Sequence, residues 1–151
     1  MNSELRALVL KHELDHAGHE RIKYAFCFAC ASRIQHLLEN DEAITAYQKF
    51  DAYMKGELDQ LQFAELKQSI WTVANKHQGS TSLDGTKHSA VSATYALANA
   101  INGQAVAAAE YAAYSRVYGY GGYAASDLDS YQEEYSEQVK ILQRLLEAAQ
   151  N

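Results

Sequence analysis

The sequence predicts an all-α protein, a single-domain helical bundle of about six or seven helices spanning residues 1–151. The 151 residues contain no proline, although loop-rich and β-rich domains of this length use proline in their turns. Residues 89–126 contain thirteen alanines and only two charged residues, Glu110 and Arg116. Such a segment is typical of a closely packed helical hairpin, because alanine favours helices and lets two backbones approach each other. Elsewhere, apolar residues recur at three- and four-residue spacing.

The first half of the chain predicts four helices, over residues 3–17, 19–39, 41–54 and 59–76. Leu5, Leu8 and Val9 share one face of the first helix, together with His12. Gly18 is expected to break the chain before the second helix. Asn40 and Asp41 read as a stop followed by an N-cap, and Gly56 as the C-terminal stop of the third helix.

The second half predicts a loop over residues 78–85, an alanine-rich hairpin and a final helix. The hairpin helices cover residues 86–101 and 104–118, joined tightly through Asn102 and Gly103. A loop over residues 119–125 leads to the final helix, whose expected buried face contains Leu128, Tyr131, Tyr135, Val139, Leu142, Leu146 and Ala149. Polar Thr94 and Asn99 are expected to bond neighbouring carbonyls rather than line a ligand cleft. No repeat of 20 to 50 residues is present, which argues against a solenoid.

Composition and charge limit the function classes. A hydrophobic content of 48% and a charged content of 21% are typical of soluble globular proteins. The chain has no apolar run long enough to span a membrane, and its N-terminus does not resemble a secretory signal. With two cysteines, these features predict a cytoplasmic protein without a membrane partner. The net charge of −6 argues against nucleic acid and suits a basic protein partner.

His12, Glu13 and His16 fit the HExxH pattern of zinc hydrolases, in which two histidines on one helical face bind zinc and the glutamate activates water. Zinc needs a third protein ligand. His19 would lie about 10 Å from His12 along a continuous helix, too far to share one ion comfortably. We therefore expect no metal, no cofactor and no enzyme activity, and keep a small zinc-dependent hydrolase with His12, His16 and His19 as the alternative.

Cys27 and Cys30 form a CxxC pair in the middle of a helical pattern. Redox CxxC motifs open a helix, where the N-terminal dipole stabilises the thiolate. The position here favours two small buried hydrophobic side chains.

Residues 118–123 combine tyrosine and glycine and precede an acidic segment. Tyrosine offers a large contact area at small entropic cost, which suits protein recognition. The expected partner-binding surface comprises Tyr118, Tyr120, Tyr123, Asp127, Asp129, Glu133, Glu134 and Glu137. The alternative is a loop whose tyrosines cap the bundle, followed by acids that favour the helix dipole.

Four segments together resemble one protein family. They are residues 15–39 with the core Ala29–Glu39, the spacer Ala52–Leu58, the alanine-rich residues 87–114 and the closing residues 131–146. In this order they resemble the Imm-five-like group of immunity proteins from bacterial polymorphic-toxin systems. The histidine-rich start and the tyrosine-rich loop depart from that group.

The resemblance implies an all-helical cytoplasmic protein that binds and neutralises a cognate toxin by steric occlusion, without catalysis. It transfers no catalytic residue. A zinc hydrolase and a helical scaffold or ligand-binding bundle remain the alternatives. Because an alanine-rich hairpin can serve a dimer interface as readily as a core, the sequence also leaves a homodimer open.

Overall fold

The computed structural model describes residues 1–76, 86–119 and 127–150, which form seven α-helices, two short 3-10 helices and no strand. This confirms the predicted all-α bundle. The elements are α1 (Ser3–Lys11), α2 (Glu20–Ile34), η1 (Gln35–Leu37), α3 (Asp41–Met54), α4 (Gln60–Lys76), α5 (Thr86–Ile101), α6 (Ala105–Tyr118), η3 (Leu128–Tyr131) and α7 (Gln132–Gln150). Within these residues, no helix combines the length and the apolar character needed to cross a membrane.

The hairpin of α5 and α6 forms the centre of the bundle, as predicted. Alanines of both helices are fully or almost fully buried, namely Ala93, Ala96, Ala98, Ala100, Ala105, Ala108, Ala109, Ala112 and Ala113. At the open end of the hairpin, the Ser89 hydroxyl donates to the Ser115 carbonyl at 2.6 Å, and the Ser115 hydroxyl donates to the Ser89 carbonyl at 2.8 Å. These reciprocal bonds hold the two backbones close together.

The turn between α5 and α6 depends on Gly103, which has a φ of 72°. A Cβ atom at this position would also lie 3.1 Å from the Tyr24 hydroxyl of α2. Both the backbone conformation and the close approach of α2 therefore favour glycine.

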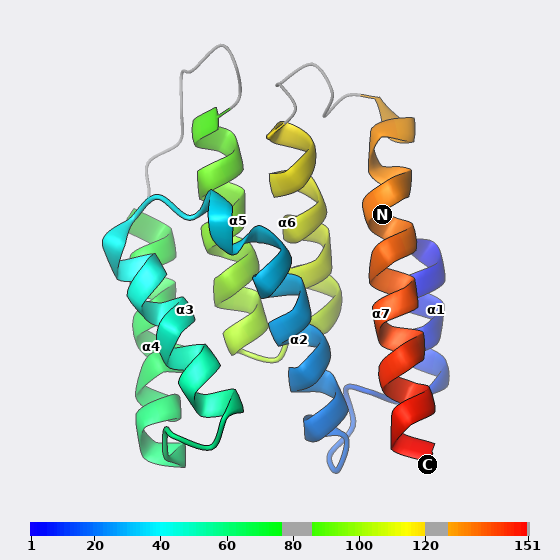
Figure 1. Ribbon diagram of the computed structural model, residues 1–151, viewed down its shortest axis with the longest axis horizontal. Coiled ribbons are helices and arrows are strands. Elements are labelled where there is room, and N and C mark those ends of the chain that lie inside the picture. Colours follow the sequence, from blue (N-terminus) through cyan, green and yellow to red (C-terminus); the bar gives the residue numbers. More distant parts are fainter. Residues whose placement is uncertain (77–85, 120–126, 151) are drawn as a thin grey trace.

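The other helices surround the hairpin on three sides (Figure 1). Helix α2 packs across both hairpin helices. Helices α3 and α4 lie on the α5 side, whereas α7 and α1 lie together on the α6 side. The α3–α4 pair and the α1–α7 pair therefore form opposite flanks of the bundle.

Side-chain caps define the start of α3 and the first turn of α4. Asn40 accepts a bond from the Glu42 amide at 2.7 Å, so the N-cap is Asn40 and not the predicted Asp41. Asp59 and Gln62 each accept a bond from the other's amide, which is a reciprocal capping box. Gly56 follows the end of α3 with a φ of 78°, as expected for a helix stop.

The first helix is shorter than predicted. Helix α1 ends at Lys11, and residues 12–18 form turns in which Glu13 has a φ of 52°. These turns carry Leu14 into the core, where it is fully buried. With Leu14 buried in this way, the helix that the HExxH pattern needs does not form. The break falls after Lys11, earlier than predicted, and Gly18 lies at the end of these turns.

The start of the final helix also differs from the prediction. Leu128 begins the short η3 helix and is 79% exposed, so it does not belong to the buried face. Tyr131, Val139 and Leu142 of that face are buried as expected, Tyr135 and Leu146 are partly buried, and Ala149 is exposed. The predicted loop over residues 78–85 lies outside the described residues.

Candidate protein-binding face

Three tyrosines lie on the outer side of α6. Tyr111, Tyr114 and Tyr118 follow each other at three- and four-residue spacing, on the side of the helix away from its buried alanines. Tyr111 is 38% exposed and Tyr114 is 47% exposed. The hairpin therefore presents large aromatic side chains to solvent on one side while the alanines pack on the other.

Neighbouring aromatic rings hold these tyrosines in place. Tyr111 stacks on Tyr95 of α5, with ring centroids 5.5 Å apart. Tyr114 stacks on Tyr118 at 6.2 Å and meets the edge of Tyr131 in η3 at 5.5 Å. Rings that are ordered in the free protein lose little side-chain entropy when a partner binds.

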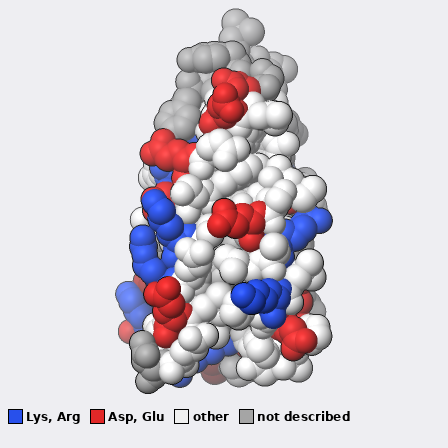
Figure 2. All heavy atoms as spheres, turned by 90° about the vertical axis from the view of Figure 1, so that its right-hand side faces the viewer, with Lys and Arg blue, Asp and Glu red and all other residues white. Residues whose placement is uncertain are grey.

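Exposed acids adjoin the tyrosines at the start of the last helix. Tyr131 brings η3 against Tyr114 of α6, and Asp127 caps η3 by accepting a bond from the Asp129 amide at 3.0 Å. We define the contact face as Tyr111, Tyr114, Asp127, Leu128, Asp129 and Glu133, all of which are exposed. Figure 2 shows acidic side chains gathered near the start of α7, whereas acidic and basic side chains mix farther along the same side.

Burial raises the pKa of the supporting phenols further above neutral pH. Tyr131 is 5% exposed, and burial, reinforced by neighbouring tyrosines, raises its pKa to about 12. Burial, followed by the nearby Glu110, also raises the pKa of Tyr135. Both hydroxyl groups therefore stay neutral over the physiological range, and the negative charge of the face comes from its carboxylates.

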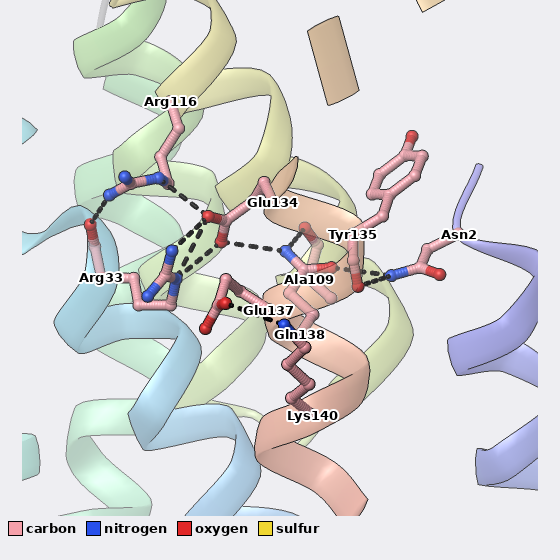
Figure 3. Close-up of polar contacts among 9 residues, drawn as sticks. All are labelled: Asn2, Arg33, Ala109, Arg116, Glu134, Tyr135, Glu137, Gln138 and Lys140. Atoms are coloured by element: carbon pink, nitrogen blue, oxygen red, sulfur yellow. Dashed lines mark hydrogen bonds and ion pairs between the residues drawn. The ribbon is translucent and has the colours of Figure 1, made fainter. Parts of the chain in front are cut away.

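A buried carboxylate connects the start of α7 to α2 and α6 (Figure 3). Glu134 is 5% exposed and accepts bonds from Arg33 of α2, from Nε at 2.9 Å and from Nη2 at 2.6 Å. The Nε of Arg116 in α6 lies 2.8 Å from the same carboxylate. Arg116 also donates from Nη1 to the Arg33 carbonyl at 2.9 Å. The bond to Glu134 raises the pKa of Arg33, so this guanidinium keeps its charge at neutral pH.

The polar network continues from Glu134 toward α1. Gln138 donates to the Ala109 carbonyl at 2.9 Å and to Glu134 at 3.4 Å. Asn2 donates to Gln138 at 3.2 Å and to the Tyr135 carbonyl at 3.1 Å. Side chains that project toward one another in Figure 3 thus connect α1, α2, α6 and α7. This network sets the position of α7 and, through it, the position of the contact face.

Apart from Glu134, the predicted surface residues separate into three groups. Asp127, Asp129 and Glu133 are exposed, as the prediction requires. Tyr118 is partly exposed and stacks on His88 and Tyr114, and Glu137 lies 3.6 Å from Lys140. Tyr120 and Tyr123 lie outside the described residues.

The prediction is wrong for one residue, Glu134. We expected it on the contact surface, but its carboxylate is buried between Arg33 and Arg116. Reversing its charge would place a cation against two guanidinium groups, so Glu134→Lys cannot serve as a harmless probe of binding.

Tyr111, Tyr114 and Leu128 were not predicted as residues of the contact surface. The helical spacing of Tyr111, Tyr114 and Tyr118 in an otherwise small-residue helix was the available signal. The contacts of Arg116 with Arg33 and Glu134 could not be predicted from local sequence patterns, because the three residues come from different helices.

The alternative metal site does not have the geometry that its motif requires. His12 and His16 lie in turns beyond the end of α1, and the closest approach between Glu13 and His16 is 4.0 Å between exposed side chains. His19 precedes the first residue of α2. In residues 1–76, 86–119 and 127–150, no three His, Cys, Asp or Glu side chains are grouped to hold a metal ion.

The CxxC pair lies in the core, as predicted. Cys27 and Cys30 are free thiols with exposures of 0% and 1%. Burial raises the pKa of Cys27 to about 12 and raises that of Cys30 as well. Neither thiol is therefore a reactive thiolate at neutral pH.

Comparison of the chain with family models, with curated proteins and with solved structures finds no match. The resemblance to Imm-five-like immunity proteins therefore stays a prediction that these comparisons do not test.

Proposed function

We propose that this protein is an immunity protein that binds a cognate bacterial toxin domain and neutralises it by steric occlusion, without catalysis. The resemblance described above suggests this class. The observation that carries the proposal is the pair of exposed, ring-stacked tyrosines on α6, one of which, Tyr114, contacts Tyr131 directly after the exposed acids Asp127 and Asp129.

The two kinds of side chain have different tasks in this proposal. Tyr111 and Tyr114 supply contact area in fixed orientations, and tyrosine is enriched among residues that dominate binding energy. Asp127, Asp129 and Glu133 favour a basic partner, because complementary charge accelerates association and disfavours acidic proteins. A basic toxin domain, such as a nuclease, fits these properties.

Co-expression tests the proposed function directly. The tagged protein would be produced with the isolated C-terminal domain of the protein encoded immediately upstream. We expect a one-to-one complex and relief of growth inhibition. Inhibition that persists with both proteins present, with no complex recovered, would contradict the proposal.

A matched pair of variants distinguishes specific binding through the contact face from nonspecific hydrophobic association. The double variant Tyr111→Ala/Tyr114→Ala should lose protection, because truncating central aromatic residues at an interface costs about 2 kcal/mol or more each. Leu61→Ala is the control, because Leu61 is 70% exposed on α4, on the opposite flank. Its protection should equal that of the unmodified protein.

A further inference from the structure

The surface between α3 and α4 contains a continuous groove. One hollow of about 350 Å³ is lined by Asp41, Glu42, Thr45, Ala46, Lys49, Leu66, Ser69, Ile70 and Val73. A second of about 320 Å³ is lined by Lys49, Leu58, Gln62, Glu65, Leu66 and Ser69. The two hollows share Lys49, Leu66 and Ser69, so together they follow the seam between the two helices.

The dimensions of this groove suit a helix. Along α4 it extends from Gln62 to Val73, which is roughly 16 Å at 1.5 Å per residue. That length matches about three helical turns. Ala46, Leu66 and Ile70 form its floor but are at most 5% exposed. The apolar surface open to a partner comes from partly exposed Leu58 and from the methyl and methylene groups of exposed Thr45 and Lys49. A helix with apolar residues at i, i+3, i+4 and i+7 could pack along it.

The charges at the edges of the groove select for a basic occupant. Asp41, Glu42 and Glu65 are exposed and line the hollows, whereas Lys49 is the one base among the residues that line them. Three carboxylates against one ammonium group disfavour an acidic helix and attract a basic one.

We infer that the α3–α4 groove binds a basic amphipathic helix of a partner protein. The groove lies on the opposite flank from α7 and its exposed acids (Figure 1). It is a second interaction site and does not rest on the proposed function of the contact face.

Three synthetic peptides of about 14 residues test the groove with the full chain. The first places leucine at i, i+3, i+4 and i+7 and lysine elsewhere. The second has the same composition with the leucines spread around the helix, and the third replaces lysine by glutamate. Fluorescence anisotropy measures affinity, and backbone amide chemical shifts locate the site.

We expect the amphipathic basic peptide to bind at least about tenfold more tightly than either other peptide. Its chemical-shift changes should centre on α3 and α4. Equal binding of the scrambled basic peptide, or shift changes centred on α6 and α7, would overturn the inference.

Variants provide an independent check. Ser69→Trp fills the groove from an exposed position, and Gln68→Trp places the same side chain on the neighbouring exposed residue, which does not line either hollow. The first should weaken peptide binding at least about tenfold, and the second should leave it unchanged. Glu42→Lys/Glu65→Lys should weaken binding similarly without filling the groove. Unchanged peptide affinity in Glu42→Lys/Glu65→Lys or in folded Ser69→Trp would refute the proposed binding site in the groove.

The same peptide assay distinguishes this inference from the proposed function. Tyr111→Ala/Tyr114→Ala should bind the basic peptide as well as the unmodified protein does. Loss of peptide binding in that double variant would assign the peptide to the contact face and overturn the groove site.

Discussion

Glu134 is the residue that joins distant parts of the chain. Its carboxylate contacts Arg33, 101 residues earlier, and Arg116, which belongs to the central hairpin. A buried ion cluster of this kind stabilises the fold little compared with well-packed apolar residues. Removing one partner is nevertheless strongly destabilising, because it leaves the remaining charges buried without a counter-ion. The cluster therefore fixes where α7 lies more than it adds to total stability.

Glu134→Gln should destabilise the protein because it leaves two guanidinium groups facing each other without their anion. We expect a loss of about 3 kcal/mol, reduced from the fully buried case because both arginines are 27% exposed. For a chain of this length that is roughly 6–12 °C in Tm. Thermal unfolding followed by circular dichroism measures the change.

Glu137→Gln is the matched control, since Glu137 is 36% exposed and lies near Lys140. Its Tm should stay close to that of the unmodified protein. Equal Tm values for the two variants would show that the cluster does not position α7 as described.

The two cysteine thiols should be unreactive in the folded protein. Both are buried, and the pKa of Cys27 is raised to about 12. At about pH 8, a thiol reagent should modify neither cysteine in native protein and both in guanidinium chloride. Rapid modification of the native protein would contradict the described core.

The raised pKa of Cys27 also makes the stability of the fold depend on pH in the alkaline range. Above the ordinary value of 9.0, the thiol ionises in the unfolded chain while Cys27 keeps its proton in the fold. Cys27 therefore lowers the free energy of unfolding as pH rises from about 9 to about 12.

At the scale of elements, helices with strong local sequence patterns could be predicted. Where tertiary contacts end a helix, its last residue could not. The alanine-rich hairpin and its turn at Gly103 follow from propensity and a glycine stop, and the structure confirms them. The first helix was overextended because burial of Leu14 lies outside any local pattern. The same limit applies to the contact face, since the burial of Glu134 next to exposed Glu133 depends on arginines from other helices.

The close approach of α5 and α6 requires small side chains at their interface. Ala112 is fully buried, so Ala112→Leu should force the helices apart and cost about 3 kcal/mol. Ala107→Leu is the control because Ala107 is partly exposed on the same helix. Urea unfolding should show a large loss for the first variant and little change for the second. Similar stabilities would indicate that the hairpin tolerates wider spacing than described.

At the scale of the whole molecule, two candidate interaction surfaces occupy opposite flanks of one bundle. The contact face combines ordered tyrosines with acids, and the α3–α4 groove combines apolar residues at its base with acids at its edges. Both suit basic partners, in agreement with the net charge of −6. The contact face belongs to α6, η3 and the start of α7 and the groove to α3 and α4, so the two surfaces share no residue.

The most direct test of the central claim is the affinity of the upstream-encoded C-terminal domain for matched variants, measured by isothermal titration calorimetry. Tyr111→Ala/Tyr114→Ala should weaken binding by a factor of about 100 or more, whereas Leu61→Ala should leave the affinity unchanged. Raising the salt concentration should slow association, because the exposed acids steer a basic partner. Equal affinities for the double variant and the unmodified protein, with both fully folded, would contradict the assignment of the contact face.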